Sequence, residues 1–112
     1  MKRIYIAGPY SAPNARQIQI NVDFAIKIGC SMIRKGWVPF IPHLSHYIWL
    51  HPDGDFAYKI WTNLDLEWLK VCDAFYYIGS SPGVDVELKI AEEMGIPIYY
   101  KCVDVPDLNE GV

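Results

Sequence analysis

The fold is decided by residues 74–100, which read AFYYIGSSPGVDVELKIAEEMGIPIYY. The apolar run Ala74–Ile78 has the β-branched and aromatic composition of a buried strand. After a Gly/Ser/Pro loop, Val84–Met94 shows helical periodicity, which a glycine and a proline then stop. A second apolar run, Pro97–Tyr100, follows. The order strand, helix, strand predicts two parallel strands joined by a right-handed crossover.

The same alternation extends toward the N-terminus. We predict strands at Arg3–Ala7 and Trp37–Ile41, and helices over Ala15–Lys35 and Phe56–Lys70. The strand segments are almost continuously apolar, which is typical of a sheet covered on both faces. We therefore expect a single domain over residues 1–112 of the α/β class. Its expected architecture is three-layer and flavodoxin- or Rossmann-like, with a parallel sheet of four to five strands and helices on both faces.

Two segments lack a regular pattern. His43–Asp55 contains three histidines, a proline and a glycine, and is predicted to be a loop or a short helix of the kind that forms lids and specificity segments. The polar tail Val103–Val112 is expected either to be loose or to dock on a partner subunit.

Composition excludes several classes of protein. With 112 residues, 52% hydrophobic and 21% charged, the chain can form one buried core. A net charge of −3 argues against a binder of nucleic-acid polymers. The cysteines, Cys30, Cys72 and Cys102, are odd in number and widely spaced, so we expect no disulfide and a reducing compartment. Because no signal peptide or membrane-length apolar run is evident, we expect a cytoplasmic protein that does not bind membranes.

The expected binding edge lies beyond the carboxyl ends of the parallel strands, where open α/β sheets bind ligands. Gly8–Ser11 follows the first strand, and Gly79–Gly83 follows the third. Gly/Ser/Pro clusters are usually turns, and neither loop has the pattern of a dinucleotide site or a P-loop. A phosphate cradle at Gly79–Gly83 is one interpretation, and a plain turn is the other.

Asp65 occupies an unexpected position in its predicted helix. At 100° per residue it falls within the apolar arc formed by Trp61, Leu64, Trp68 and Leu69. An acid that faces a core is costly unless it is paired, hydrogen-bonded or open to a cleft.

Glu87 repeats this anomaly in the next helix. It lies along the apolar stripe, close enough to the helix N-terminus for the macrodipole to favour its ionised form. An ionised carboxylate in a partly dry pocket is a candidate nucleophile. The alternative for Asp65 or Glu87 alone is a satisfied core acid that pairs with a tyrosine or an arginine. Two such acids on successive helices, near one strand end, favour a site.

The histidines suggest a metal site only weakly. The set His43, His46, His51, Asp53 and Asp55 matches no established zinc spacing, so we expect pocket-lining or surface histidines and no metal. The tryptophans and tyrosines are interpreted mostly as core residues, of which one or two stack on a flat ligand such as a nucleobase.

Three motifs occur in the order IYIAGP (Ile4–Pro9), DLEWLKVCDAF (Asp65–Phe75) and GSSPGVDVELKIAEEMGIPI (Gly79–Ile98). Together they resemble the nucleoside 2-deoxyribosyltransferase-like family, and within it most closely the 2'-deoxynucleoside 5'-phosphate N-hydrolases. The resemblance spans Ile4 to about Tyr100 and is weakest over His43–Tyr58, where such proteins differ in base recognition.

The resemblance implies a role for each motif residue. Glu87 would attack the anomeric carbon, Asp65 would assist departure of the base, and Tyr5 would lie near the nucleophile. The first loop, Gly8–Ser11, would bind the 5'-phosphate, yet it contains no arginine, and Arg16 is the nearest candidate. A free nucleoside therefore stays an alternative substrate. The residues predicted to contact substrate are Gly8, Pro9, Tyr10, Ser11, Ser80, Ser81, Gly83 and His43.

The resulting hypothesis is an N-glycosidase that acts on (2'-deoxy)nucleoside 5'-monophosphates through a covalent intermediate on Glu87, without a cofactor. The paired carboxylates suit this chemistry as they suit retaining glycoside hydrolysis. A deoxyribosyltransferase and a catalytically silent nucleotide-binding module are the alternatives. The resemblance also implies a homodimer or larger homo-oligomer, with active sites completed by a neighbouring subunit.

Overall fold

The computed structural model describes residues 1–109, and these contain a four-stranded, all-parallel sheet. The strand order is β2-β1-β3-β4, which places β1 and β3 at the centre. The strands are β1 (Arg3–Ala7), β2 (Val38–Phe40), β3 (Ala74–Tyr77) and β4 (Ile98–Tyr99). The predicted α/β class is confirmed, and each predicted strand forms, shortened by up to one residue at each end.

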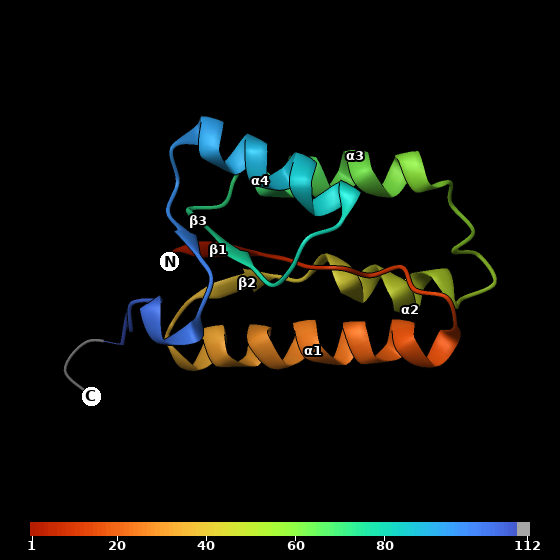
Figure 1. Ribbon diagram of the computed structural model, residues 1–112, viewed down its shortest axis with the longest axis horizontal. Coiled ribbons are helices and arrows are strands. Elements are labelled where there is room, and N and C mark those ends of the chain that lie inside the picture. Colours follow the sequence, from red (N-terminus) through yellow and green to blue (C-terminus); the bar gives the residue numbers. More distant parts are fainter. Residues whose placement is uncertain (110–112) are drawn as a thin grey trace.

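Helices cover both faces of this sheet (Figure 1). One long helix runs along one face, and two helices lie together on the other. Ser81 caps the last of these helices and Asn14 caps the first, each by accepting a bond from a backbone N–H of the first turn. The α-helices are α1 (Ala15–Arg34), α2 (Ser45–Trp49), α3 (Tyr58–Leu69) and α4 (Pro82–Met94).

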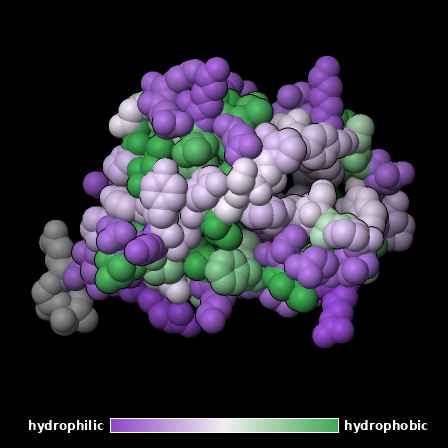
Figure 2. Space-filling view, viewed as in Figure 1, coloured by the Kyte–Doolittle hydropathy of each residue, from purple (hydrophilic) through white to green (hydrophobic). Residues whose placement is uncertain are grey.

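Alternation along β1 divides the core into two clusters. Ile4 and Ile6 face α1 and pack with Met32, whereas Tyr5 and Ala7 face α3 and α4. Both clusters are buried, as the predicted three-layer arrangement requires. Figure 2 shows hydrophilic side chains over the outer helices and apolar ones between the layers.

The irregular segment 43–55 forms short helices. A 3₁₀ turn, Pro42–Leu44, leads directly into α2, and the chain then returns to α3 through a bend. Both predicted alternatives, a loop and a short helix, are thus present in successive parts. None of the helices within residues 1–109 combines the length and apolar composition that crossing a bilayer requires.

The C-terminal segment packs on its own chain. The Lys35 ammonium donates to the carbonyls of Cys102 and Val105, at 2.6 and 2.8 Å, and the Trp37 indole donates to the Pro106 carbonyl at 2.8 Å. Val105 is buried in the α1-side core. For residues 103–109 this corrects the expectation of a loose segment, whereas docking on a partner subunit stays a prediction. The remaining part of the predicted tail, 110–112, lies outside the described residues.

Candidate active site

Tyr5 places a hydroxyl beneath α4. It lies in the middle of β1 with no exposed surface, and its ring packs between those of Phe40 and Phe75, with centroids 5.5 and 5.8 Å away. The phenol donates a hydrogen bond to Oε2 of Glu87. Because the aromatic rings fix Tyr5, its hydroxyl fixes the position of the Glu87 carboxylate.

Glu87 is a partly buried acid. Burial raises the pKa of its carboxyl, although the hydrogen bond from Tyr5 acts in the opposite direction. Burial thus acts against the predicted effect of the helix end, which stays a prediction. Because α4 begins at Pro82, Glu87 lies in its second turn, where the macrodipole is weaker than in the first.

Asp65 projects from α3 toward the same site. Burial, together with the negative charge of Glu87, raises the pKa of Asp65 to about 7. Burial and both carboxylates also raise the pKa of Tyr5 above its usual range, so the phenol stays protonated. The predicted convergence of Asp65 and Glu87 is thus present as an electrostatically coupled group of three side chains. Neither acid forms an ion pair within residues 1–109.

A pocket of about 400 Å³ opens beside Asp65. It lies between α3 and the segment that runs from β2 into α2. Trp68 stacks on Phe40 in its wall, with ring centroids 5.3 Å apart, and Trp61 completes the aromatic lining. Asp65 and Ser45 are its polar side chains, and Glu87 does not line it. The pocket therefore reaches one carboxylate of the pair directly.

Gly8 allows the two predicted loops to approach each other. A Cβ at this position would lie 2.8 Å from Cβ of Ile78, closer than side-chain atoms pack. The Ile78 N–H also donates to the Ala7 carbonyl at 2.7 Å, which extends the pairing of β1 with β3. The loops after these strands thus lie at the same edge of the sheet, as predicted.

Two histidines, His43 and His46, hold the rest of the first loop. His43 is 4% exposed, and its Nε2 lies 3.1 Å from the Pro9 carbonyl oxygen. The Tyr10 hydroxyl shares a 2.8 Å hydrogen bond with Nδ1 of His46. Ser11 and Arg16 are exposed. His43 was predicted to contact the substrate. In the structure it is buried behind the first loop and contacts the loop backbone instead.

The second loop uses its serines locally. Ser81 Oγ accepts the Val84 N–H at 3.2 Å, and Ser80 Oγ donates to Asp85 at 2.8 Å. Gly83 lies close to the Tyr58 hydroxyl, which a Cβ there would approach to 3.3 Å. Among residues 1–109 the Ser81 O–H has no acceptor, whereas the Ser80 O–H donates to Asp85.

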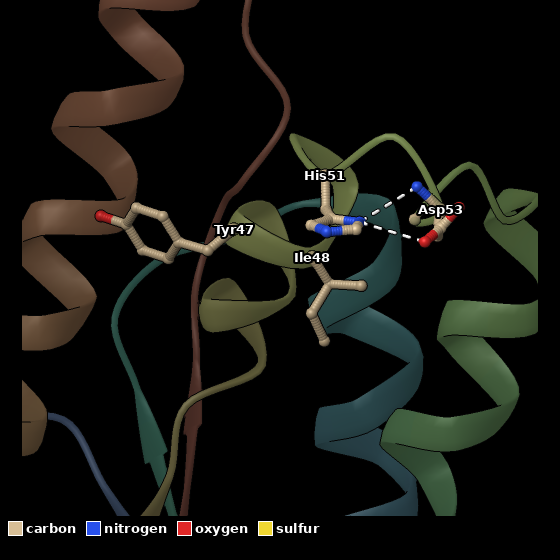
Figure 3. A pocket seen from close by; sticks show the side chains of 5 residues that line it. Tyr47, Ile48, His51 and Asp53 are labelled. Atoms are coloured by element: carbon tan, nitrogen blue, oxygen red, sulfur yellow. Dashed lines mark hydrogen bonds and ion pairs between the residues drawn. The ribbon is translucent and has the colours of Figure 1, made fainter.

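A second pocket, of about 320 Å³, lies at the opposite end of α2 (Figure 3). Its lining includes His51 and Asp53, an exposed pair whose Nδ1 and Oδ2 atoms are 3.8 Å apart. Tyr47 points away from this pair toward α1, where its hydroxyl accepts from Gln19. No predicted site residue lines this pocket, and residues 1–109 contain no group of three potential metal ligands among His, Cys, Asp and Glu.

Sequence reasoning missed two anchors of the first loop: His46, and Asn21 of α1, whose amide donates to the Tyr10 carbonyl at 3.1 Å. It also missed the aromatic wall formed by Phe40 and Trp68. The sequence does contain a signal for the aromatic wall, because the apolar arc predicted for α3 includes two tryptophans, Trp61 and Trp68. Asn21 had none, since an asparagine within a helix has no distinctive spacing. His46 was interpreted as a pocket-lining or surface histidine, but it is buried and hydrogen-bonded to Tyr10.

Comparison with known protein families gives one match. Residues 2–101 match the model of a family described as a domain of unknown function (DUF7768), and the chain belongs to this family. No curated protein matches the chain. The family description specifies no activity, so the resemblance to nucleoside 2-deoxyribosyltransferase-like proteins stays a prediction.

Proposed function

We propose that this member of the DUF7768 family is an N-glycosidase that hydrolyses the base–sugar bond of (2'-deoxy)nucleoside 5'-monophosphates. The observation that carries the proposal is the hydrogen bond from Tyr5 to Glu87 beside Asp65, whose pKa is raised to about 7. Titratable groups with strongly perturbed pKa values at the ligand edge of an α/β sheet are typical of catalytic sites. The motif resemblance assigns the same three residues.

In the first step, the Glu87 carboxylate attacks the anomeric carbon as the bond to the base nitrogen breaks. The electron pair of that bond goes to the base, and Asp65 supplies a proton to it. A carboxyl with a pKa of about 7 suits this task, because it is protonated in a large fraction of molecules and still releases its proton readily. The products are the free base and a glycosyl ester of Glu87.

In the second step, water displaces the Glu87 carboxylate from the anomeric carbon. The Asp65 carboxylate takes a proton from a water molecule as its oxygen attacks the anomeric carbon, and the Glu87 carboxylate leaves. Asp65 ends protonated and Glu87 ionised, as at the start. The Tyr5 phenol stays protonated throughout and holds the carboxylate of Glu87 in one orientation.

The pocket beside Asp65 suits the base. A planar heterocycle fits against aromatic walls, and Phe40, Trp61 and Trp68 provide them next to the proposed proton donor. The sugar would then lie between this pocket and Glu87, with its 5'-phosphate toward the loops after β1 and β3.

The proposal includes a cytoplasmic location and a homo-oligomer. All three cysteines are free thiols, which suits a reducing compartment. The α3 side chains Leu64 and Trp68 are 47% and 54% exposed, and a second subunit is one way to cover them.

The test is to incubate the purified protein with a panel of ribo- and deoxyribonucleoside 5'-monophosphates and the matching nucleosides, and to measure free base by chromatography. We expect release from at least one monophosphate, and none with Glu87→Gln. Adding a second base separates a hydrolase from a transferase, since only the latter forms a new nucleoside. If no substrate releases base at high protein concentration, the proposal is overturned.

A further inference from the structure

His43 holds the loop after β1 through one ring nitrogen. The residue lies in the 3₁₀ turn Pro42–Leu44, and its Nε2 atom is 3.1 Å from the Pro9 carbonyl oxygen. A carbonyl oxygen only accepts hydrogen bonds, so Nε2 carries the proton and Nδ1 carries the lone pair. The Nδ1 atom is buried and has no hydrogen-bond partner within residues 1–109. The structure therefore satisfies one N–H of this imidazole and offers no acceptor to a second.

The titratable groups around His43 come from three elements. In the loop after β1, the Tyr10 ring meets the imidazole edge-on, with ring centroids 6.4 Å apart. In α2, His46 is hydrogen-bonded to the Tyr10 hydroxyl and packs edge-on against the Tyr47 ring. These neighbours are aromatic rings without a negative charge at neutral pH.

The third element, α1, contributes a carboxylate at a distance. This helix packs against the 3₁₀ turn, and its Gln19 amide donates to the Tyr47 hydroxyl at 3.3 Å and to the Asp23 carboxylate at 2.9 Å. Asp23 is exposed to solvent. Neither buried histidine forms an ion pair with Asp23 or with another acid within residues 1–109. A positive charge on His43 would therefore have no ion-pair partner among the described residues.

Protonation of His43 is costly while the loop is in place. Burial lowers the pKa of the imidazole, and the backbone at Pro9 and Gly8 acts in the opposite direction. A proton on Nδ1 would create a buried charge and a second buried N–H without an acceptor. Both costs disappear when Nδ1 reaches water. Acid therefore favours a conformation in which the turn has separated from the loop.

His46 provides a comparison on the same segment. It is also buried, but its Nδ1 atom shares a 2.8 Å hydrogen bond with the Tyr10 hydroxyl. A hydroxyl both donates and accepts, so this bond forms whether or not Nδ1 carries a proton. Of the two buried histidines, His43 is thus the one whose ring nitrogen lacks an acceptor for an added proton.

The segment that carries both histidines, residues 42–50, has little buried apolar surface. Its large apolar side chains are about half exposed, namely Leu44, Tyr47, Ile48, Trp49 and Leu50. Regions with few buried apolar contacts open at a lower free energy than the whole fold. Opening of this segment should therefore require less free energy than disruption of the sheet, whose central strands are buried.

We propose that His43 is an acid-sensitive switch: protonation of its Nδ1 atom releases residues 42–50 from the loop after β1. At neutral pH the segment is closed, and in mildly acidic solution it opens. Leu44, Ser45 and Ile48 of this segment also line the pocket beside Asp65, so opening removes one wall of that pocket. The inference goes beyond the proposed function and does not depend on it, because the switch responds to protons alone.

The experiment measures amide hydrogen exchange of the full chain by mass spectrometry at pH 7.5 and pH 5, with rates corrected for the intrinsic effect of pH. In the wild type, residues 42–50 should lose about tenfold in protection at pH 5, because a histidine in the open state, with an ordinary pKa of about 6.5, takes up a proton and favours opening. Strands β1 and β3 should keep their protection.

Two variants form a matched pair. His43→Gln can still donate an N–H to the Pro9 carbonyl but does not titrate, so residues 42–50 should be equally protected at both pH values. His46→Gln removes the comparison histidine from the same segment and should keep the tenfold loss. Thermal unfolding at pH 7.5 establishes whether each variant is folded.

A measurement on the wild type decides the question if His43→Gln does not fold. In an NMR titration, the ring signals of His43 and the amide signals of residues 42–50 should change with one common midpoint. Separate midpoints would overturn the inference.

Three results of the exchange experiment would also overturn it. The first is unchanged protection of residues 42–50 in the wild type at pH 5. The second is a loss that persists in His43→Gln or that disappears in His46→Gln. The third is an equal loss in β1 and β3, which would indicate acid unfolding of the whole domain.

Discussion

On one face of the sheet, Met32 of α1 and the C-terminal segment pack against Ile4 and Ile6, and the buried members of that cluster within residues 1–109 are apolar or aromatic. On the other face, α3 and α4 bury Tyr5 together with two acids whose pKa values are raised. The second face also leaves large apolar side chains of α3 half exposed beside a pocket. The same two central strands thus support two different kinds of packing.

This difference separates stability from chemistry. A closed apolar cluster gains free energy from every buried atom. A cluster that contains coupled acids loses part of that gain through desolvation, and such a cost is typical of functional sites. Variants on the α1 side should therefore change mainly the free energy of unfolding, and variants of the acids on the α3/α4 side mainly the rate of base release.

The largest expected effect is on catalysis at the α3/α4 face. Glu87→Gln should lower base release by about 10³-fold or more, because the proposed nucleophile is lost. The fold should persist, since the amide oxygen can still accept from Tyr5. Steady-state kinetics measures the loss of activity, and thermal unfolding measures whether the fold persists. A variant that unfolds, or one that keeps its activity, would break the contrast between the faces.

Truncation in the α1-side cluster should change stability most. Met32 has no exposed surface, so Met32→Ala should cost about 2–5 kcal/mol of the free energy of unfolding. Leu64→Ala on the half-exposed side of α3 should cost less than about 1 kcal/mol, as surface substitutions generally do. Denaturant titration measures both. Equal losses would contradict the difference in burial between the two faces.

A smaller effect is expected where the two loops meet. Gly8→Ala would place a Cβ 2.8 Å from Cβ of Ile78, so the backbone that carries Ile78 must shift. We expect a loss of about 1–3 kcal/mol in the free energy of unfolding. Separation of the loops should also raise KM for the proposed substrate. Gly95→Ala is the comparison at a glycine with nothing near a Cβ, although its positive φ adds strain of its own. An unchanged stability for Gly8→Ala would mean that the loops separate freely.

The smallest effect is a gain in stability. Asp65 has a higher pKa when folded than when unfolded, so the folded protein holds the extra proton between about pH 4 and 7. Stability therefore falls as the pH rises through this window, because the buried carboxyl must ionise. Asp65→Asn should remove that fall and stabilise the protein by about 1–2 kcal/mol at pH 8, a value reduced for its partial exposure to solvent.

Denaturant titrations at pH 5 and pH 8 measure this gain. In the wild type, the rate of base release should decline above about pH 7, as Asp65 loses the proton it donates. A wild-type rate that keeps rising to pH 9 would contradict the assignment of Asp65 as the acid.

Local patterns in the sequence predicted the elements well. The apolar runs, the helical periodicity and the glycine and proline stops are read within about ten residues of one another, and the strands and helices lie close to their predicted ranges. The position of Asp65 and Glu87 on apolar stripes is equally local, since it depends only on helix geometry.

Contacts between distant residues could not be read in this way. Tyr5 and Glu87 are 82 positions apart, and Pro9 and His43 are 34 apart. The docking of the C-terminal segment on Lys35 and Trp37 joins residues about 70 positions apart. No local periodicity encodes such pairs.

The sequence by itself determined the parallel α/β fold, the sheet edge at which the loops after β1 and β3 meet, and the two acids that face inward, because each follows from short-range spacing. Only the tertiary structure decided the bond from Tyr5 to Glu87, the raised pKa of Asp65 and the anchoring of the first loop. These depend on burial and on which side chains meet, and desolvation acts only once the chain has packed.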